Sequence, residues 1–427
     1  MALNPARKVL ANGVTVMAKA NHTTPAVSIV CGIRAGGYLD PVDRDGTAAL
    51  VARVLDRGTI SRPADVIADD LDGRGASISV SAGRHQIGLN ATCLTADFPQ
   101  VLALAVDILR RPAFPDREVA TRRADLVTSI RQDEDQPASR AVDAFMSELY
   151  GAHPYARRVR GTVATVDRLV RQDLVSFHQA WFRPTALTVV VVGDVTEAQV
   201  LDAVASVVGD WSAAAFANGT TDGLVVPAAP QASARRLVTV PMPNKAQADV
   251  AYGFVGIRRS DPGFMAASVM NNALGQYAIG GRLGDSIRER QGMAYYVSSS
   301  MDAGVGDGPL MIRAGVSAEN IERTIASIDA ELALVLRDGF AAKEIDQSKS
   351  YLVGSLPRQL ETNAAIAAFL LNADLFGLGL DYDARLPDLV QAVTLDAAHA
   401  AARRLLNPEH ATIAVAGPQA QATDERR

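Results

Sequence analysis

The sequence has few of the residues that build metal centres or disulfide frameworks. Its 427 residues include two cysteines and six histidines. Cys31 and Cys93 lie inside apolar, strand-like runs, which favours buried reduced thiols over a disulfide. A pair of cysteines alone is also a poor zinc site, since structural zinc takes four ligands. We therefore expect neither a disulfide scaffold nor a cysteine-based metal centre.

Long apolar runs and concentrated charge are scarce as well. No window reaches the ~18 to 20 apolar residues of a membrane-spanning helix, and the first twenty residues contain no apolar stretch of signal-peptide length. The net charge is -5, and the paired arginines are scattered. These features predict no membrane segment and no nucleic-acid groove. The default location is the cytoplasm, with the periplasm as the alternative for a mature exported chain.

The sequence does contain enough apolar material for large cores. Hydrophobic residues make up 48% of the chain and charged residues 21%, as in ordinary soluble proteins. A chain of 427 residues is long enough for two to three domains.

An internal repeat divides the chain in two. "DLVSFHQAWFRPTALTVVVVGD" begins at Asp173 and "DAAHAAARRLLNPEHATIAVAGP" begins at Asp396. Each predicts an amphipathic helix that stops at a proline and a strand that ends in glycine. A second pair of segments aligns Glu118 with Glu344, in the same order and at nearly the same offset. Two such matches predict two homologous halves.

We place the halves at residues 1–211 and 235–427. The intervening segment 212–234 is rich in Ala, Gly, Pro, Ser and Thr, which is typical of a linker. Several predicted strands follow one another without a helix in between, which favours antiparallel pairing. We therefore predict an α+β fold in which each half is a mainly antiparallel sheet with helices packed on one side. In the first half we expect strands at 13–20, 26–36, 76–83, 85–94 and 186–193, and helices at 98–110, 117–134, 138–150 and 170–181.

The stretch "DGTAALVARVLDRGT", residues 45–59, predicts an amphipathic helix that ends at a Gly-Thr pair. It follows the Gly-rich strand "AVSIVCGIRAGGYLDP" in a twofold repeated α+β chain. In this setting it resembles the zinc-binding region of the pitrilysin/insulinase-type peptidases, whose inverted motif is H-x-x-E-H. The frame of that region, Gly46-Thr47-Ala48 and Gly58-Thr59, is present.

The resemblance implies that this helix has lost its metal chemistry. Ala49 and Arg53 occupy the positions of two histidine ligands, Ala52 that of the general base, and Ser129 that of a glutamate ligand on a later helix. Alanine offers no lone pair, and Arg53 is a permanent cation that would repel a divalent ion. No two of the six histidines are four residues apart, so no helix offers a chelating i, i+4 pair. We expect no metal and no cofactor in this chain.

A second motif, "LGDSIRERQGMAYYVSSSM" at residues 283–301, resembles the segment that these peptidases carry in the other half of the fold. The resemblance implies that Arg288 and Tyr295 hydrogen-bond the substrate beside the scissile bond. The local pattern fits, because a helix is predicted to end at Gly292 and a strand follows at once. A guanidinium and a phenol side by side form a donor pair suited to a developing oxyanion.

Simpler roles for these residues stay open. Arg288 could complement the C-terminus of its helix, and Tyr295 could be a core aromatic with its hydroxyl at the rim. Tyr296 could replace Tyr295 if the register shifted by one residue. We expect its side chain on the opposite face of the strand.

Two other motifs predict structure rather than chemistry. "GAHPYARRVRGT", residues 151–162, also fits the family pattern, and we expect a loop in which His153 is packed or capped. "GVGDGPL", residues 304–310, predicts a hairpin turn, since a phosphate cradle needs a following helix N-terminus.

The resulting expectation is the non-zinc subunit of a heterodimeric metallopeptidase. A homologous zinc-carrying partner subunit would supply the metal and the general base, and Arg288 and Tyr295 would hold a peptide substrate and its oxyanion during hydrolysis. The chain alone would be inactive. The alternatives are a catalytically inactive scaffold or assembly protein and a homodimer that binds peptides without cleaving them.

Overall fold

The computed structural model describes residues 2–212, 225–276 and 281–418. These residues form two compact units, each with its own sheet. Both units combine segments from both halves of the chain, so neither is a continuous stretch of sequence. Unit 1 consists of Met1–Arg131, Arg158–Val225 and Leu356–Ala384, and unit 2 of Gln132–Arg157, Val226–Ser355 and Arg385–Arg427.

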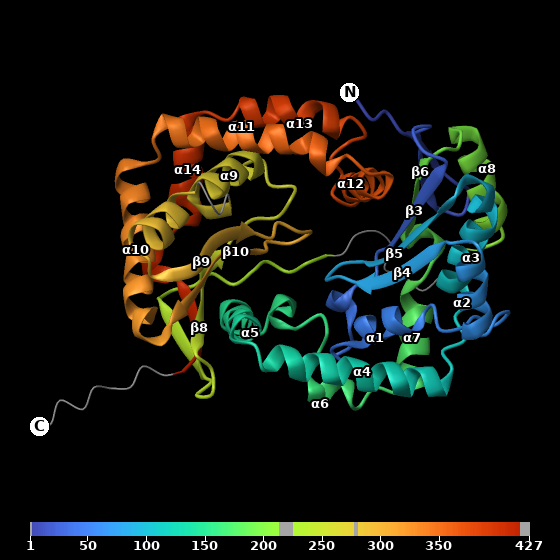
Figure 1. Cartoon of the computed structure of the whole chain (residues 1–427), viewed down its shortest axis with the longest axis horizontal. Helices are drawn as coiled ribbons and strands as arrows, with labels where there is room; N and C mark the ends of the chain where they lie inside the picture. Colours follow the sequence, from blue (N-terminus) through green and yellow to red (C-terminus); the bar gives the residue numbers. More distant parts are fainter. Residues whose placement is uncertain (1, 213–224, 277–280, 419–427) are drawn as a thin grey trace, which may run out of the picture. The chain divides into compact units, whose positions relative to one another are not determined.

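The sheet of unit 1 has its strands in the order β1-β2-β6-β3-β5-β4 (Figure 1). β2 and β6 run parallel, and the other neighbouring strands are antiparallel. This pairing confirms the predicted α+β fold. The strands are β1 (Ala6–Val9), β2 (Thr15–Ala20), β3 (Ala26–Ile33), β4 (Ser77–Ala82), β5 (Ile87–Leu94) and β6 (Leu187–Gly193).

Among the residues that the structure describes, the sheet of unit 2 repeats this pattern without a counterpart of β1. Its order β7-β11-β8-β10-β9 matches β2-β6-β3-β5-β4, and β7 and β11 form the corresponding parallel pair. The other pairs are again antiparallel. The repeat in the sequence is therefore a repeat of the fold. The strands are β7 (Arg236–Pro241), β8 (Gln247–Val255), β9 (Ala294–Met301), β10 (Pro309–Ser317) and β11 (Thr412–Gly417).

The central strands β6 and β11 end in the same backbone conformation. Gly193 has φ 155° and Gly417 has φ 156°, values that side chains other than glycine rarely adopt. A Cβ atom on Gly193 would collide with the backbone of Ala26, and one on Gly417 would come within 2.6 Å of the Cα of Ala248. The repeated glycine is thus required by close packing between strands in both halves.

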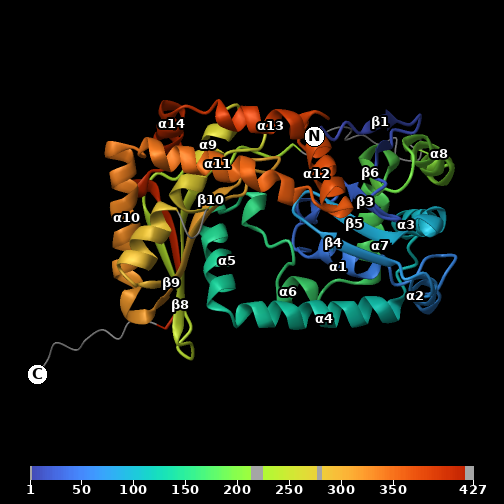
Figure 2. The same cartoon turned by 45° about the horizontal axis from the view of Figure 1, so that its top comes forward.

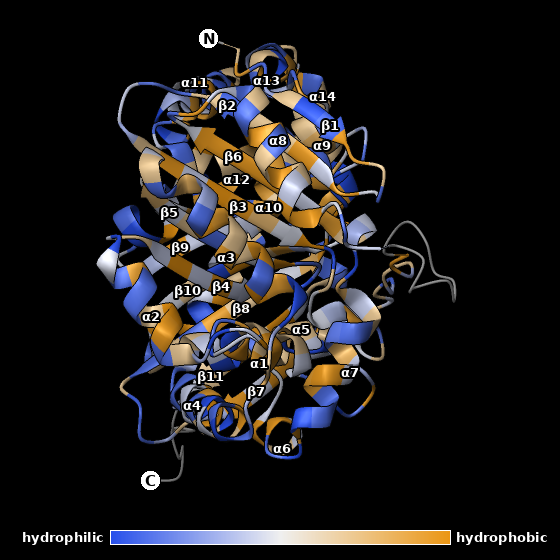
Figure 3. Ribbon diagram, turned by 90° about the vertical axis from the view of Figure 1, so that its right-hand side faces the viewer, coloured by the Kyte–Doolittle hydropathy of each residue, from blue (hydrophilic) through white to orange (hydrophobic). Residues whose placement is uncertain are grey.

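One face of the first sheet packs against helices of its own half. Alternate residues of β3, including Ile29 and Cys31, belong to a large core cluster with these helices. Cys31 and Cys93 are both buried free thiols, as expected. Figure 3 shows the strongly apolar colouring of β6. The helices of this half are α1 (Thr47–Val54), α2 (Ala64–Gly73), α3 (Phe98–Arg110), α4 (Asp116–Glu134), α6 (Val163–Val166), α7 (Arg171–Trp181) and α8 (Glu197–Val208).

The other face of this sheet is covered by a helix from the second half of the sequence. Helix α12 (Asn363–Leu375) lies beside β3 and β6 (Figures 1 and 2). Its apolar side chains pack with Met17, Val30 and Val190 in a separate core cluster. Its last turn is fixed by Asp374, which accepts a hydrogen bond from the Thr188 hydroxyl at 3.0 Å. Both faces of β6 are therefore buried, which explains its run of four valines.

Unit 2 has the reciprocal arrangement. Helix α5 (Pro137–Tyr150), from the first half of the sequence, lies beside β8 and β11 (Figure 2). The strand residues outside the main core on this side are small and fully buried, among them Ala251, Ala414 and Ala416. The main core lies on the opposite face. The remaining helices are α9 (Phe264–Asn271), α10 (Ile321–Asp338), α11 (Ala342–Gln359), α13 (Tyr382–Gln391) and α14 (Leu395–Leu405), with α11 and α13 shared between the units.

The exchange of α5 and α12 was not visible in the sequence. The compact units follow spatial contacts rather than homology, so the sequence-based boundaries at 1–211 and 235–427 stay a prediction. Of the predicted linker 212–234, residues 213–224 lie outside the described residues. Across the part of the chain that the structure describes, no helix has the length and apolar character needed to cross a membrane.

Candidate functional site

Helix α1 is the element in which the sequence predicted a missing metal site. It begins after Gly46, whose φ of 97° is left-handed. The Asp40 carboxylate accepts hydrogen bonds from the backbone N–H groups of Gly46 and Ala48 at 2.7 and 2.8 Å, which satisfies the start of the helix. Ala49 and Ala52 are both buried, with 7% and 2% exposure. The helix thus presents methyl groups at two of the four positions that carry ligands or the base in the family.

The Gly-Thr pair that follows α1 has a structural role of its own. The Thr59 hydroxyl donates to the Asp107 carboxylate at 2.7 Å, and Ser61 and Arg62 donate to the same oxygen at 2.8 and 3.1 Å. Arg111 binds the other oxygen at 2.7 Å. Burial alone would raise the pKa of Asp107, but these hydrogen bonds and the nearby guanidinium lower it. The family frame around α1 therefore holds the fold together even without metal ligands.

The two remaining positions carry or contact guanidinium groups. Arg53 is half-buried in the last turn of α1. Ser129 lies on α4, and its hydroxyl accepts a hydrogen bond from Arg160 at 3.0 Å. The backbone of Arg160 also touches the start of α1, because a Cβ atom on Gly46 would lie 2.7 Å from the Arg160 carbonyl oxygen.

These residues do not fit zinc. Two methyl groups, a hydroxyl and two cations provide neither the converging lone pairs nor the negative charge that a divalent ion needs. Among residues 2–212, 225–276 and 281–418, no group of three or more His, Cys, Asp and Glu side chains is placed to hold a metal ion.

The second motif forms the predicted helix–glycine–strand reversal. Its helical part, Gly284–Arg290, is wound as a π-helix, with Ile287 fully buried in the core. Gly292 has φ 62°, and its N–H donates to the Arg288 carbonyl at 3.1 Å. β9 starts two residues later. Gly292 therefore ends the helix in the left-handed conformation that the sequence predicted.

Tyr295 is the extra residue of a β-bulge in β9. Tyr296 pairs with Gly315 of β10, but the next pair joins Ala294 to Val316, so Tyr295 is skipped. Ala294 and Val297 both pack into the core, and the two tyrosines between them point away from it. Tyr295 is 63% exposed and Tyr296 36%. The expectation that Tyr296 faces the opposite side was therefore wrong, because the bulge interrupts the alternation of the strand.

The structure places Arg288 and Tyr295 on either side of Gly292. The Arg288 side chain is partly exposed, and its Nε lies 3.1 Å from the Glu289 carboxylate. No hydrogen bond joins Arg288 to Tyr295 within the described residues. Tyr295 is not a core aromatic, and both side chains can be reached by a ligand. Their predicted role in catalysis stays a prediction.

His153 and the turn 304–310 have structural roles, in line with the sequence. The His153 ring accepts a hydrogen bond from the Tyr155 N–H at 3.1 Å and contacts the Pro227 carbonyl at 3.1 Å. It also packs against the rings of Tyr150 and Tyr155. β9 and β10 are joined by a hairpin turn, as predicted, but the turn spans residues 302–308, and Pro309 and Leu310 already belong to β10.

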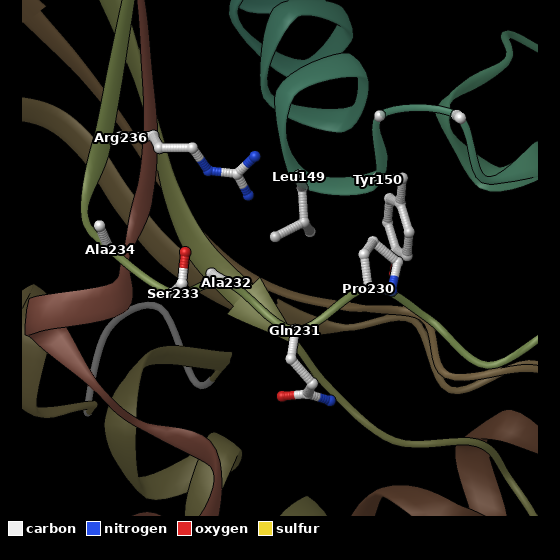
Figure 4. Close-up of a pocket in the computed structure, with 10 residues that line it drawn as sticks. Leu149, Tyr150, Pro230, Gln231, Ala232, Ser233, Ala234 and Arg236 are labelled. Carbon is white, nitrogen blue, oxygen red and sulfur yellow. The ribbon is translucent and has the colours of Figure 1, made fainter.

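Unit 2 also contains a pocket of about 250 Å³ between the end of α5 and the segment 230–236 (Figure 4). Its walls include Leu149, Tyr150 and Pro230. The charged residue in its wall, Arg236, is bound to Glu148 at 3.3 Å and to the Thr412 hydroxyl at 3.1 Å. This pocket brings together none of the sequence-predicted site residues.

Sequence comparison decides the family. Residues 15–163 match the profile described as Insulinase (Peptidase family M16), and residues 168–352 match the profile of the Peptidase M16 inactive domain. The chain belongs to peptidase family M16. Together the two matches include α1, Ser129, Arg288 and Tyr295 of this M16 protein. The resemblance read from its sequence is confirmed.

Similar proteins carry different names. A Bacillus subtilis protein named "Uncharacterized zinc protease YmxG" is 25% identical over 94% of this M16 chain and 95% of its own. A Helicobacter pylori protein named "Non-peptidase homolog YmxG" is 23% identical over 90% of this chain and 87% of its own. The crystal structure of a peptidase M16 inactive domain from Pseudomonas fluorescens superposes with a TM-score of 0.89, at 26% identity and 98% coverage of both chains.

Proposed function

We propose that this chain is the non-zinc subunit of a two-chain M16 peptidase and that it supplies Arg288 and Tyr295 to the peptide during hydrolysis. The difference between the two motif regions carries the proposal. Helix α1 presents methyl groups and a guanidinium where zinc would need ligands. Tyr295, in contrast, projects from a strand bulge into an exposed position.

Two exposed donors beside a scissile bond would act in the same way as an oxyanion hole. Arg288 and Tyr295 would hold the peptide carbonyl and stabilise the negative charge that develops on its oxygen. Removal of one such donor typically costs ~3 kcal/mol of transition-state stabilisation. The hydrolytic centre itself would come from a zinc-bearing homologue, so the isolated chain would be inactive.

The edge strand β4 supports the choice of a peptide as substrate. β4 is the last strand of its sheet, and Ser77, Ser79 and Ser81 are exposed on it. An extended peptide can add to such an edge through its backbone hydrogen bonds. Helix α1 lies against β4, so an added peptide would run close to the family's former metal helix.

The test is reconstitution with an M16 homologue that carries H-x-x-E-H. The two chains are co-expressed and purified through a tag on one of them, and hydrolysis of a fluorogenic peptide is measured. We expect the pair to be active, and Arg288→Ala or Tyr295→Phe to lower kcat/KM by roughly 100-fold. Arg290→Ala is the matched control, because Arg290 is an exposed arginine on the same helical turn. Undiminished turnover in both variants would overturn the proposal.

A second candidate is a protein that binds partners or peptides without cleaving them. The name of the Helicobacter pylori relative, a non-peptidase homologue, favours it. Under this alternative, no zinc-bearing homologue co-purifies and Arg288→Ala changes nothing in any hydrolysis assay. Size-exclusion chromatography of the lone chain with a fluorescent peptide then shows whether peptide binding remains.

A further inference from the structure

A row of three residues crosses the second sheet next to Tyr295. Asp249 on β8, Gly315 on β10 and Tyr296 on β9 are direct neighbours in register. The Tyr296 hydroxyl donates a hydrogen bond to the Asp249 carboxylate, two strands away. Because neighbouring strands are ~4.8 Å apart, the Tyr296 ring must lie across the backbone of Gly315 to reach that far.

Gly315 makes this crossing possible. A Cβ atom at this position would lie 2.8 Å from Cδ1 of Tyr296 and still closer to Cε1, so any other residue would displace the ring. The Arg313 guanidinium, on the diagonal position of β10, lies 6.0 Å from the centre of the same ring. The Tyr296 side chain is therefore held by Asp249 at its hydroxyl, while its ring lies over Gly315 and next to Arg313.

The hydrogen bond lies in a largely buried setting. Asp249 is 7% exposed, and burial raises its pKa although the Tyr296 hydrogen bond opposes the shift. Burial, followed by the hydrogen bond to Asp249, raises the pKa of Tyr296 to about 12. The phenol is therefore protonated at neutral pH and remains a donor.

The hydrogen bond and the bulge stabilise each other through the register of β9. If the strand continued in the register that pairs Ala294 with Val316, Tyr296 would turn toward the core, because a shift of one residue exchanges the two faces. It could then no longer reach Asp249. The anchored ring thus holds β9 in the register that leaves Tyr295 as the extra, exposed residue.

We propose that Tyr296, anchored on Asp249 across Gly315, is a positioning residue that fixes the β9 bulge and with it the direction of Tyr295. The role of Tyr295 as a donor to the peptide rests on the proposed function, whereas the fixing of the bulge does not. Nothing in the sequence motif distinguishes the two adjacent tyrosines. The structure assigns them different tasks, one as the exposed donor and the other as its support.

The first experiment uses the isolated full-length chain. Asp249→Ala removes the anchor, Tyr296→Phe removes the donated hydrogen, and Asp249→Asn keeps an acceptor oxygen. We expect backbone amides of residues 294–298 to exchange hydrogen at least roughly fivefold faster in the first two variants and at the wild-type rate in Asp249→Asn. Ser300→Ala, on the same face of β9, is the control and leaves the rates unchanged. Unchanged exchange in both Asp249→Ala and Tyr296→Phe, with unchanged melting temperature, would overturn the proposal.

The second experiment measures peptide hydrolysis in the pair formed with the zinc-bearing homologue. We expect Asp249→Ala to lower kcat roughly tenfold with KM within about twofold, and Asp249→Asn to restore kcat, because the donor is misdirected rather than lost. An active pair in which Asp249→Ala speeds exchange but leaves kcat unchanged contradicts the positioning role. If no pair is active, the proposed function fails, and the exchange rates still decide whether Tyr296 fixes the bulge.

Discussion

The edge strands β4 and β9 occupy the same place in the two repeated sheets, yet they differ in regularity. β4 pairs with β5 in an unbroken register from Ser77 to Ala82, whereas β9 is interrupted at Tyr295. Because the two halves share one topology, β4 shows what the fold requires of this strand. The bulge is an addition that core packing does not demand, and it exposes an aromatic hydroxyl. The second half therefore carries the exposed donor of the candidate site, while the first half retains a helix without ligands.

The largest expected effect is the conversion of the first half into a metal site. The fourfold variant Ala49→His, Ala52→Glu, Arg53→His and Ser129→Glu supplies three ligands and a base in the family pattern. We expect one zinc per chain by elemental analysis after dialysis against a weak chelator, compared with trace zinc in the wild type. The control keeps Ser129 and changes only α1, and we expect it to bind zinc more weakly. A fourfold variant that stays metal-free would show that these four positions do not converge.

The converse change makes the second half as regular as the first. Deletion of Tyr295 would give β9 the continuous register of β4. We expect peptide turnover by the reconstituted pair to fall roughly 100-fold, because the exposed donor is lost. The melting temperature should change little, since the Tyr295 side chain is largely exposed. Wild-type turnover by the variant that lacks Tyr295 would show that the bulge and its exposed tyrosine are not needed for hydrolysis.

A third test separates the frame around α1 from its vacant ligand positions. Asp107→Asn should lower the free energy of unfolding by about 2 to 3 kcal/mol, since two arginines and two hydroxyls lose a buried carboxylate. Arg53→Ala should cost less than about 0.5 kcal/mol. Denaturant titration measures both. If both variants lost the same free energy of unfolding, the conclusion that Asp107 supports the fold and Arg53 does not would be contradicted.

The same carboxylate predicts a pH dependence. The pKa of Asp107 is lowered in the folded chain, so its contribution to stability is present above the pKa of the unfolded chain, about 3.9. It is lost as the pH falls through the lower, folded-state pKa. The stability difference between wild type and Asp107→Asn should therefore be constant above about pH 5 and shrink below about pH 4. A stability difference between wild type and Asp107→Asn that grows on acidification would contradict a lowered pKa of Asp107.

The smallest effect compares glycines on the equivalent strands β10 and β5. Gly315→Ala should destabilise unit 2 by about 1 to 2 kcal/mol, because its methyl group overlaps the Tyr296 ring. Gly88→Ala should change stability by less than about 0.5 kcal/mol, since the nearest atom to its new methyl group is the Cys31 carbonyl oxygen at 4.0 Å. Thermal melting of the two variants provides the measurement. Similar shifts in both would argue against the crossing of Gly315 by the ring.

The sequence predicted the local elements well because their signals are local. The strands expected at 13–20 and 85–94 correspond to β2 and β5, and the helix expected at 138–150 corresponds to α5. The sequence could not show which sheet α5 covers, because an apolar face such as that of Ala141, Phe145 and Leu149 fits either one. The placement of α12 was hidden for the same reason.

The candidate site, too, could be predicted only where its residues belong to one local motif. Ala49, Ala52 and Arg53 could be named because they share one helix and the spacing of one motif. The bulge could not, since "AYYV" has the pattern of a regular strand and its interruption depends on the pairing with β10. The support from Asp249 was out of reach as well, because that residue lies 47 positions before Tyr296 in the chain. Contacts across strands leave no periodic trace in the sequence.

The exchange of α5 and α12 between the two halves of the sequence has a consequence for synthesis on the ribosome. Unit 1 receives its last segment, Leu356–Ala384, only after more than four fifths of the polypeptide has been translated. Until then, helix α12, which packs against the apolar face around Met17 and Val30, is not available to bury it. A nascent or truncated first half would therefore expose an apolar, aggregation-prone surface, which a chaperone would need to cover until translation is nearly complete.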